Sequence, residues 1–185
     1  MSVARADVLA AVEAHVANEH LRRHMLATEA IMRAFAARFE EDPETWGLAG
    51  LAHDLDSEET EADFSRHGAE AAATLESLGA PPEVVHAIAA HNPATGVAWE
   101  SRMDVALIVA DQLSGLITAA ALIRPDKQLA GVALKSVRKR YREGAFARGV
   151  DREAIARCAE LGLELDETLA LGLEAMQAIA PDLGL

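Results

Sequence analysis

The sequence contains a single cysteine, Cys158, so no intramolecular disulfide can form. This scarcity is typical of a reducing compartment, and we expect a cytoplasmic protein. Aromatic residues make up only 4% of the chain, and no stretch alternates apolar and polar residues with a period of two. Because strands favour β-branched and aromatic residues, these absences argue against a sheet and favour close-packed helices.

Long uninterrupted apolar runs are also absent. The longest run, Val105 to Ile123, contains Asp111, Gln112 and Ser114, which favours a buried helix over a membrane span. The sequence does not open on a charged and then apolar leader, so we expect a soluble protein with no membrane partner.

Positive charge is scarce: 17 basic residues against 30 acidic residues give a net charge of −13. Such an excess repels phosphate backbones, so we expect no nucleic-acid partner. A small phosphorylated substrate is still compatible with this charge, because a bound cation can reverse the local field.

Helical periodicity, by contrast, runs from one end of the chain to the other. Start signals stand at Asn18, Asp42-Pro43, Pro81-Pro82, Ser101 and Asp151. The later helices are expected over about residues 67–78, 128–142, 151–161 and 166–180, and residues 56–63 form an acidic loop. No linker divides the chain, so we predict an all-α single domain over residues 1–185.

Two acidic residues stand on otherwise apolar helical segments. Asp54 follows His53 in an Ala/Leu-rich stretch, and Asp111 is embedded in the apolar run that begins at Val105. An unpaired carboxylate on such a face is costly to desolvate. One such acid suggests a buried cap or a pair with arginine, but two acids accompanied by histidines favour a divalent cation, for which imidazole and carboxylate are good ligands.

The order His24, His53-Asp54, Asp111 resembles the HD-domain superfamily of metal-dependent phosphohydrolases, whose signature is H…HD…D. More narrowly, the chain is similar to the branch that contains HDIG-type proteins and bacterial symmetrical dinucleoside-tetraphosphate hydrolases. That branch has two further histidines between the HD pair and the last aspartate, and His67 and His91 stand in those places. The resemblance covers about residues 20 to 125 and implies an HD-type bundle of about eight helices around a buried metal site, with residues 126–185 as a C-terminal helical extension.

The resemblance also implies the ligands of one or two divalent ions, whose identity stays open among Fe, Mn, Mg and Zn. His24, His53, Asp54 and Asp111 would hold the first ion. Asp54, His67 and His91 would hold the second, with Asp54 as the bridge. The implied activity is hydrolysis of a nucleotide or another small phosphoester or phosphoanhydride by metal-activated water.

The loop after the HD pair departs from many relatives, which have a lysine there. Here the loop is acidic, so it cannot bind a phosphate by charge. Besides Asp54, the candidates for a general base or a water-orienting group are Asp56 and Glu58, although the composition favours a solvated acidic loop.

A basic segment stands out in this acidic chain, from Lys135 to Arg142. One interpretation is a phosphate-recruiting patch made of Lys135, Arg138 and Lys139 with Arg124 and Lys127. The alternatives are a solvated helix face and a contact in a homo-oligomer.

Two other classes of function stay open at this stage. Some HD-fold proteins hold two irons with the same six ligand types and carry out oxidation with oxygen. A non-catalytic metal-binding or nucleotide-binding module is the other alternative.

Overall fold

The computed structural model describes residues 3–185, which form ten α-helices, three short 3-10 helices and no strand. The α-helices are α1 (Arg5–His15), α2 (Glu19–Arg38), α3 (Pro43–Ala52), α4 (Ala69–Ser77), α5 (Pro82–Ala90), α6 (Arg102–Leu122), α7 (Leu134–Arg142), α8 (Arg152–Ala156), α9 (Leu165–Ala178) and α10 (Ala180–Leu183). The 3-10 helices are η1 (Pro93–Thr95), η2 (Leu129–Gly131) and η3 (Arg157–Leu161). The all-α prediction is confirmed.

Four of the predicted start signals act as N-caps. The side chains of Asn18, Asp42 and Asp151 each accept hydrogen bonds from two backbone amides in the first turn of α2, α3 and α8. Ser101 forms a capping box with Asp104 at the start of α6. Each side chain satisfies amides that have no partner within the helix, so the sequence fixes where these helices begin.

The structure divides or shortens three of the expected helices. The helix expected over 128–142 is interrupted at Val132 and Ala133, which are extended, so η2 and α7 are separate. The helix expected over 151–161 changes from α8 to η3, and Gly162, with φ of 75°, ends it. The helix expected from His67 begins only at Ala69, because Gly68 takes a φ of 84°.

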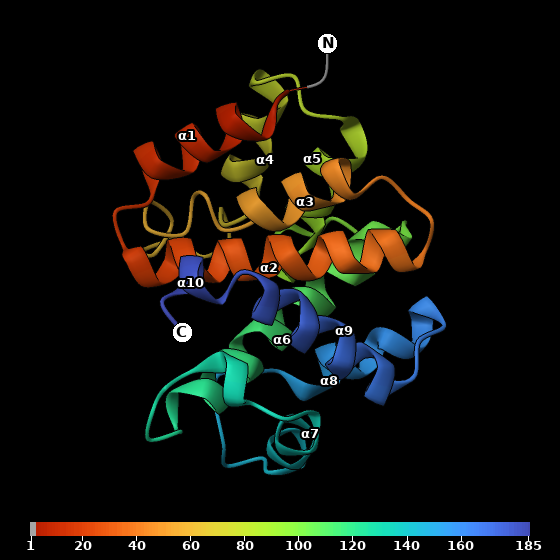
Figure 1. Ribbon diagram of the computed structural model, residues 1–185. Helices are drawn as coiled ribbons and strands as arrows, with labels where there is room; N and C mark the ends of the chain where they lie inside the picture. The colour runs from red at the N-terminus through yellow and green to blue at the C-terminus, as the bar shows by residue number, and fades with distance from the viewer. Residues whose placement is uncertain (1–2) are drawn as a thin grey trace.

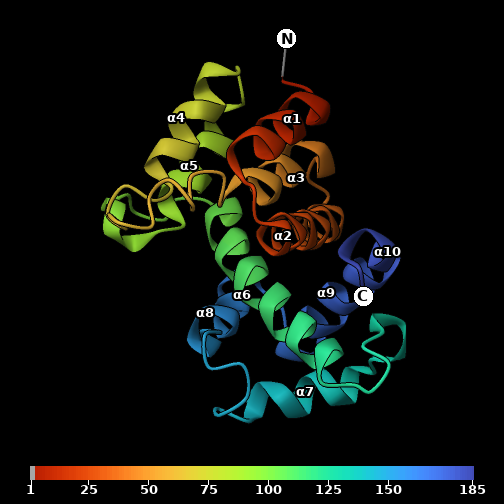
Figure 2. The same cartoon turned by 90° about the vertical axis from the view of Figure 1, so that its left-hand side faces the viewer.

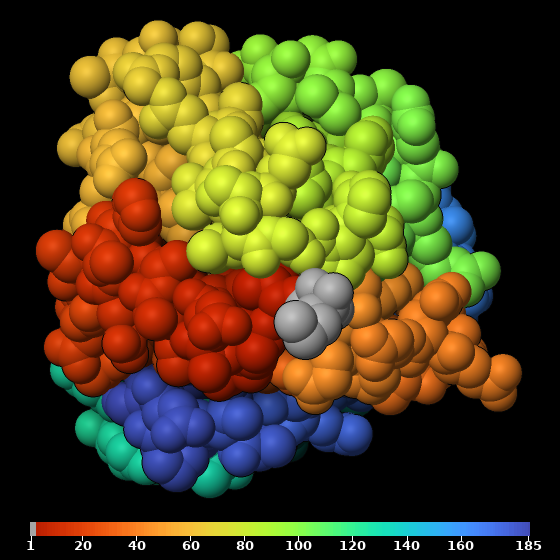
Figure 3. Space-filling model, turned by 90° about the horizontal axis from the view of Figure 1, so that it is seen from above, coloured from red at the N-terminus to blue at the C-terminus, as the bar shows by residue number. Residues whose placement is uncertain are grey.

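Helix α2 lies across the middle of the molecule and packs against α3, α6 and α9 (Figure 1). Seen from the side, α6 runs through the bundle, with α2, α3 and α5 near its N-terminal half and α7, α8 and α9 around its C-terminal half (Figure 2). From above, α1 and the segment from the α3–α4 loop to α5 cover the top of the molecule (Figure 3). The ends of α3 and α5 therefore meet α2 and α6 in the interior.

Helix α6 is long and apolar enough to cross a membrane by length and composition, with a mean hydropathy of 1.8. However, 67% of that apolar window is buried inside the protein. Leu107, Leu113 and Ile117 are fully buried there against the surrounding helices. The buried-helix prediction for this segment is therefore confirmed, and its hydrophobicity belongs to the core.

Candidate metal centre

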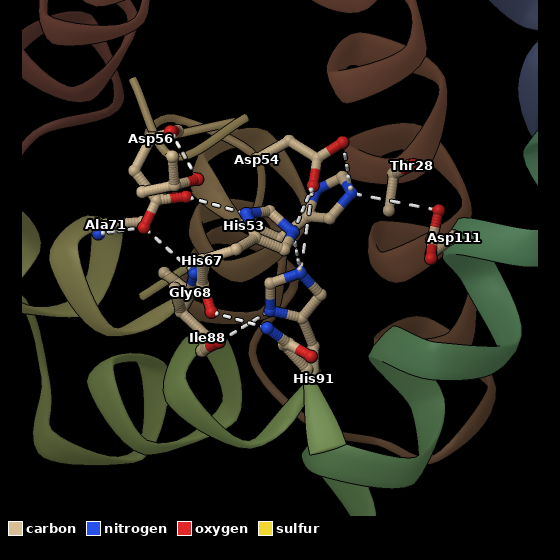
Figure 4. A network of polar contacts seen from close by, with 12 residues as sticks. Thr28, His53, Asp54, Asp56, His67, Gly68, Ala71, Ile88, His91 and Asp111 are labelled. Carbon is tan, nitrogen blue, oxygen red and sulfur yellow. Dashed lines mark hydrogen bonds and ion pairs between the residues drawn. The ribbon is translucent and has the colours of Figure 1, made fainter. Parts of the chain in front are cut away.

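Six histidine and aspartate side chains converge in the interior from several parts of the bundle (Figure 4). His24 comes from α2 and Asp111 from α6, whereas His53 and Asp54 follow the end of α3. His67 precedes α4, and His91 follows α5. The structure therefore brings together all six residues that the resemblance nominated as ligands, in two groups: His24, His53 and Asp111; and Asp54, His67 and His91.

Asp54 lies between the two groups. Its Oδ2 atom is 3.5 Å from Nε2 of both His24 and His53. Its Oδ1 atom is 3.3 Å from Nε2 of His67 and 3.7 Å from Nε2 of His91. Each carboxylate oxygen thus faces one group, which is the geometry that a bridging ligand requires.

The two imidazoles within each group face each other through Nε2. Those atoms are 3.2 Å apart in His24 and His53, and 3.1 Å apart in His67 and His91. Asp111 Oδ1 lies 3.0 Å from Nε2 of His24 and 3.8 Å from Nε2 of His53, so the aspartate of α6 closes the first group.

The other ring nitrogen of each histidine is held by the protein. Nδ1 of His53 donates to the carbonyl of Gly50 at 2.9 Å, and Nδ1 of His91 donates to the carbonyl of Ile88 at 2.6 Å. Nδ1 of His67 lies 2.8 Å from the Asp56 carboxylate. Since a carbonyl or carboxylate only accepts, these Nδ1 atoms carry the proton, and a neutral ring then directs the lone pair of Nε2 into the centre.

His24 follows the same rule through a serine. Its Nδ1 atom is 2.9 Å from Ser114 Oγ, which itself donates to the carbonyl of Asp111. The Ser114 hydroxyl proton is therefore used in the bond to Asp111, so the Ser114 oxygen accepts a hydrogen bond from His24 Nδ1. All four imidazoles consequently present Nε2 to the same space.

Two glycines allow the helices to approach closely enough for this arrangement. A Cβ atom on Gly50 would lie 2.8 Å from backbone atoms of Thr28 and Glu29, so α3 and α2 could not meet at their present distance with a larger residue. A Cβ atom on Gly68 would lie 2.9 Å from the carbonyl of Ile88 and 3.0 Å from the ring of His91. Because these segments approach so closely, the histidines near Gly50 and Gly68 in the chain are held close to those of the neighbouring helices.

The electrostatics of the centre favour a cation. Burial alone would raise the pKa of Asp54, but the surrounding imidazoles, His53 first, hold that pKa well below its usual value. Burial lowers the pKa of His53 even though two carboxylates oppose the shift. Burial opposes a charge on His24 and His67, but hydrogen bonds to Asp111 and Asp54 raise the pKa of both imidazoles. A divalent ion would take the place of these protons, and two carboxylates with four imidazoles fit one or two divalent first-row ions.

A cavity of about 360 Å³ opens beside this centre. Asp54, His67, His91 and Asp111 of the centre form part of its wall. The remaining wall includes Phe64, Trp99, Ile108 and Gln112, and the C-terminal residues Asp151, Glu153, Ala154 and Arg157. A volume of this size is in the range of small-molecule sites.

Asp56 does not belong to a solvated acidic loop, because its side chain is only 1% exposed. Its Oδ1 accepts from His67, and its Oδ2 accepts from the backbone amides of Gly68 and Ala71, each at 2.8 Å. Both oxygens are engaged, so the Asp56 carboxylate positions His67, and a role as general base stays a prediction.

Glu58 binds the backbone of another segment of the chain. Its carboxylate accepts from the backbone amides of Ala17 at 2.6 Å and Asn18 at 3.1 Å, which ties the loop after the HD pair to the segment between α1 and α2. Glu58 does not line the cavity. These hydrogen bonds join segments 40 and 41 residues apart in the chain, and the role of a base or water-orienting group at Glu58 stays a prediction.

The predicted phosphate-recruiting patch lies elsewhere on the protein. None of Arg124, Lys127, Lys135, Arg138 and Lys139 lines the cavity. Arg124 pairs with Asp126, Arg138 with Asp166 and Lys139 with Glu143. These five residues lie in the turn after α6 and on α7, away from the cavity, and their role in substrate binding stays a prediction.

Several residues at the site escaped the sequence reasoning. Ser114 lies three residues after Asp111 on the same helix, so the helical period was a usable signal for it. Asn92 follows His91, and its amide donates to the carbonyls of Phe64 and His67. Trp99 and Arg157 gave no local signal, because only tertiary packing brings them to the cavity.

Comparison with known proteins gives one match. A family model described as HD domain matches residues 21–118, which is more than half of the chain and includes all six residues of the centre. No curated protein and no solved structure was found to match.

Proposed function

The chain belongs to the HD domain family, and on that premise we propose that it is a metal-dependent phosphohydrolase that cleaves a nucleotide or another small phosphoester or phosphoanhydride. Metal-dependent hydrolysis is the chemistry that the family implies, and the six converging side chains could hold the ions. The observation that carries the proposal is the shared orientation of the four imidazoles. Each is held at Nδ1 and directs Nε2 toward the two aspartates.

His24, His53 and Asp111 would hold one ion, and His67 and His91 the other, with Asp54 between them. Bound divalent ions lower the pKa of a coordinated water and neutralise charge on the phosphoryl group. The protein itself contributes fixed ligand orientation through Gly50, Ile88, Asp56 and Ser114, and a cavity that admits a small substrate to one side of the centre.

The test is phosphate release by purified protein that has been stripped of metal and reloaded with Mn, Fe, Mg or Zn. The substrates are nucleotides, dinucleoside polyphosphates and an aryl phosphate. We expect turnover with at least one ion. If metal binds and no phosphate ester is cleaved, the hydrolase proposal fails, and oxygen consumption by the iron-loaded sample would then indicate an oxygenase instead.

Asp54→Ala separates an enzyme from a metal-binding module that lacks turnover. We expect this variant to lose at least about a hundredfold in kcat/KM while its helical circular dichroism is retained, because it removes the group between the two halves of the centre. Asp7→Ala, an exposed aspartate on α1, is the matched control and should keep full activity.

A further inference from the structure

One wall of the cavity, made of Asp151, Glu153, Ala154 and Arg157, comes from the C-terminal part of the chain, beyond the residues 21–118 that match the family. Gln112 connects this wall to the candidate metal centre. Its Oε1 accepts from the backbone amide of Asp151 at 2.8 Å, and its Nε2 donates to Asp111 Oδ2 at 2.7 Å. Since α8 also packs on α6, the wall has a fixed position relative to Asp111.

Arg157 of this wall is stacked on Trp99, which lies within the residues that match the family. The guanidinium carbon of Arg157 lies 4.0 Å from the ring centroid of Trp99. Trp99 is anchored by its Nε1, which donates to the carbonyl of Ala90 at 2.8 Å, and Arg157 is anchored by an ion pair with Glu160 at 3.0 Å. Both partners are therefore held in place, and together they give the cavity a planar, amphipathic surface.

The charges around the cavity limit what this surface can accept. Of the described residues that line it, Asp54, Asp111, Asp151 and Glu153 are acidic and Arg157 is the single arginine or lysine. Four carboxylates against one guanidinium leave a formal charge of −3, which two divalent ions would bring to +1. Those ions would lie among the six residues of the centre, whereas Asp151 and Glu153 are exposed on the C-terminal wall.

We propose that the Trp99–Arg157 pair binds the organic group of a phosphomonoester, and that Asp151 and Glu153 beside it disfavour substrates with additional phosphates. This inference rests on the proposed function and narrows its substrate class. A phosphomonoester carries a charge of about −2 at neutral pH, which bound ions at the centre can neutralise. A longer phosphate chain would bring further negative charge into the cavity beside two carboxylates, where like charges repel.

The experiment compares kcat/KM for a nucleoside monophosphate, its diphosphate and triphosphate, and an aryl phosphate, all with the same metal-loaded protein. We expect the monophosphate to be favoured over the triphosphate by at least about tenfold, because each unit charge contributes repulsion of this order at short range in a partly buried site. The double variant Asp151→Asn/Glu153→Gln should reduce that preference at least threefold, because kcat/KM for the triphosphate should rise more than kcat/KM for the monophosphate. Asparagine keeps the N-cap of α8.

The control, Glu76→Gln/Glu174→Gln, removes the same formal charge from exposed residues outside the cavity. It should leave the preference in kcat/KM for the monophosphate over the triphosphate unchanged. Arg157→Gln should raise KM for the monophosphate at least fivefold with kcat within twofold. The inference would be overturned if the wild-type protein preferred the triphosphate, or if KM for the monophosphate were unchanged in Arg157→Gln. It would also be overturned if the control changed the ratio of kcat/KM for monophosphate and triphosphate as much as the double variant does. Absence of turnover with every substrate would instead refute the hydrolase proposal.

Discussion

Asp56 provides the sharpest test of how the centre is held. Replacing it by asparagine keeps the size of the side chain but leaves only one oxygen for three donors. If that oxygen stays with the amides of Gly68 and Ala71, the new amide group faces Nδ1 of His67. A donor in that position forces the proton of His67 onto Nε2, where it points at Asp54 and blocks the lone pair.

The structure sets the expected magnitudes. A buried donor left without its acceptor costs about 1–3 kcal/mol of unfolding free energy. Loss of a hydrogen bond that orients a metal-ligating histidine lowers metal affinity by about 10–100-fold. The group of His24, His53 and Asp111 does not contact Asp56, so we expect one of two binding events to weaken and the other to persist.

Asp104 offers a matched control that the fold itself supplies. It is fully buried, and its Oδ2 accepts from the amides of Glu100 and Ser101 while its carboxylate contacts Nδ1 of His86 at 3.2 Å. Asp104→Asn should therefore lose comparable stability without any change at the centre. The assays are urea unfolding in the presence of a chelator, and calorimetric titration with Mn²⁺. Equal Mn²⁺ affinity in Asp56→Asn and Asp104→Asn would refute the positioning role of Asp56.

Five further outcomes are expected. Burial alone would lower the pKa of His67, but hydrogen bonds to Asp54 and Asp56 raise it to about 9. A folded pKa above the unfolded value near 6.5 stabilises the metal-free protein fully below pH 6.5, and thermal melts should show this stability being lost as pH rises to about 9. Because a proton and a metal ion compete for the same imidazole, Mn²⁺ binding should release protons in that pH range, which calorimetry in buffers of different ionisation enthalpy measures. Gly68→Ala, at a φ of 84° and with its Cβ 3.0 Å from the His91 ring, should weaken metal binding and lower the melting temperature, and an unchanged affinity would contradict the close approach. Addition of metal at a hundred times its Kd should add about 2.7 kcal/mol to the unfolding free energy, and a melting temperature unaffected by chelator would argue against a metal in the folded centre. Arg138→Gln and Lys139→Gln should keep kcat/KM within twofold, since neither residue lines the cavity, and a large loss would support α7 as a substrate-binding element.

The sequence alone determined where several helices begin and which residue types reach the centre. Capping at Asn18, Asp42, Ser101 and Asp151 involves amides two or three residues away, so the interaction can be read locally. Acidic residues within apolar helical segments indicated that Asp54 and Asp111 needed partners, because an isolated buried carboxylate is unfavourable. The order of histidines then suggested which residues those partners were.

Only the tertiary structure decided what the acidic loop and the C-terminal segment do. Asp56 and Glu58 are two residues apart, yet one is buried against His67 and the other holds the segment before α2. Trp99 and Arg157 are far apart in the chain and meet because α8 and η3 pack on α6. A side chain's local sequence sets its helix and its cap, but its neighbours depend on how distant helices share one core, and that packing is what defines the cavity.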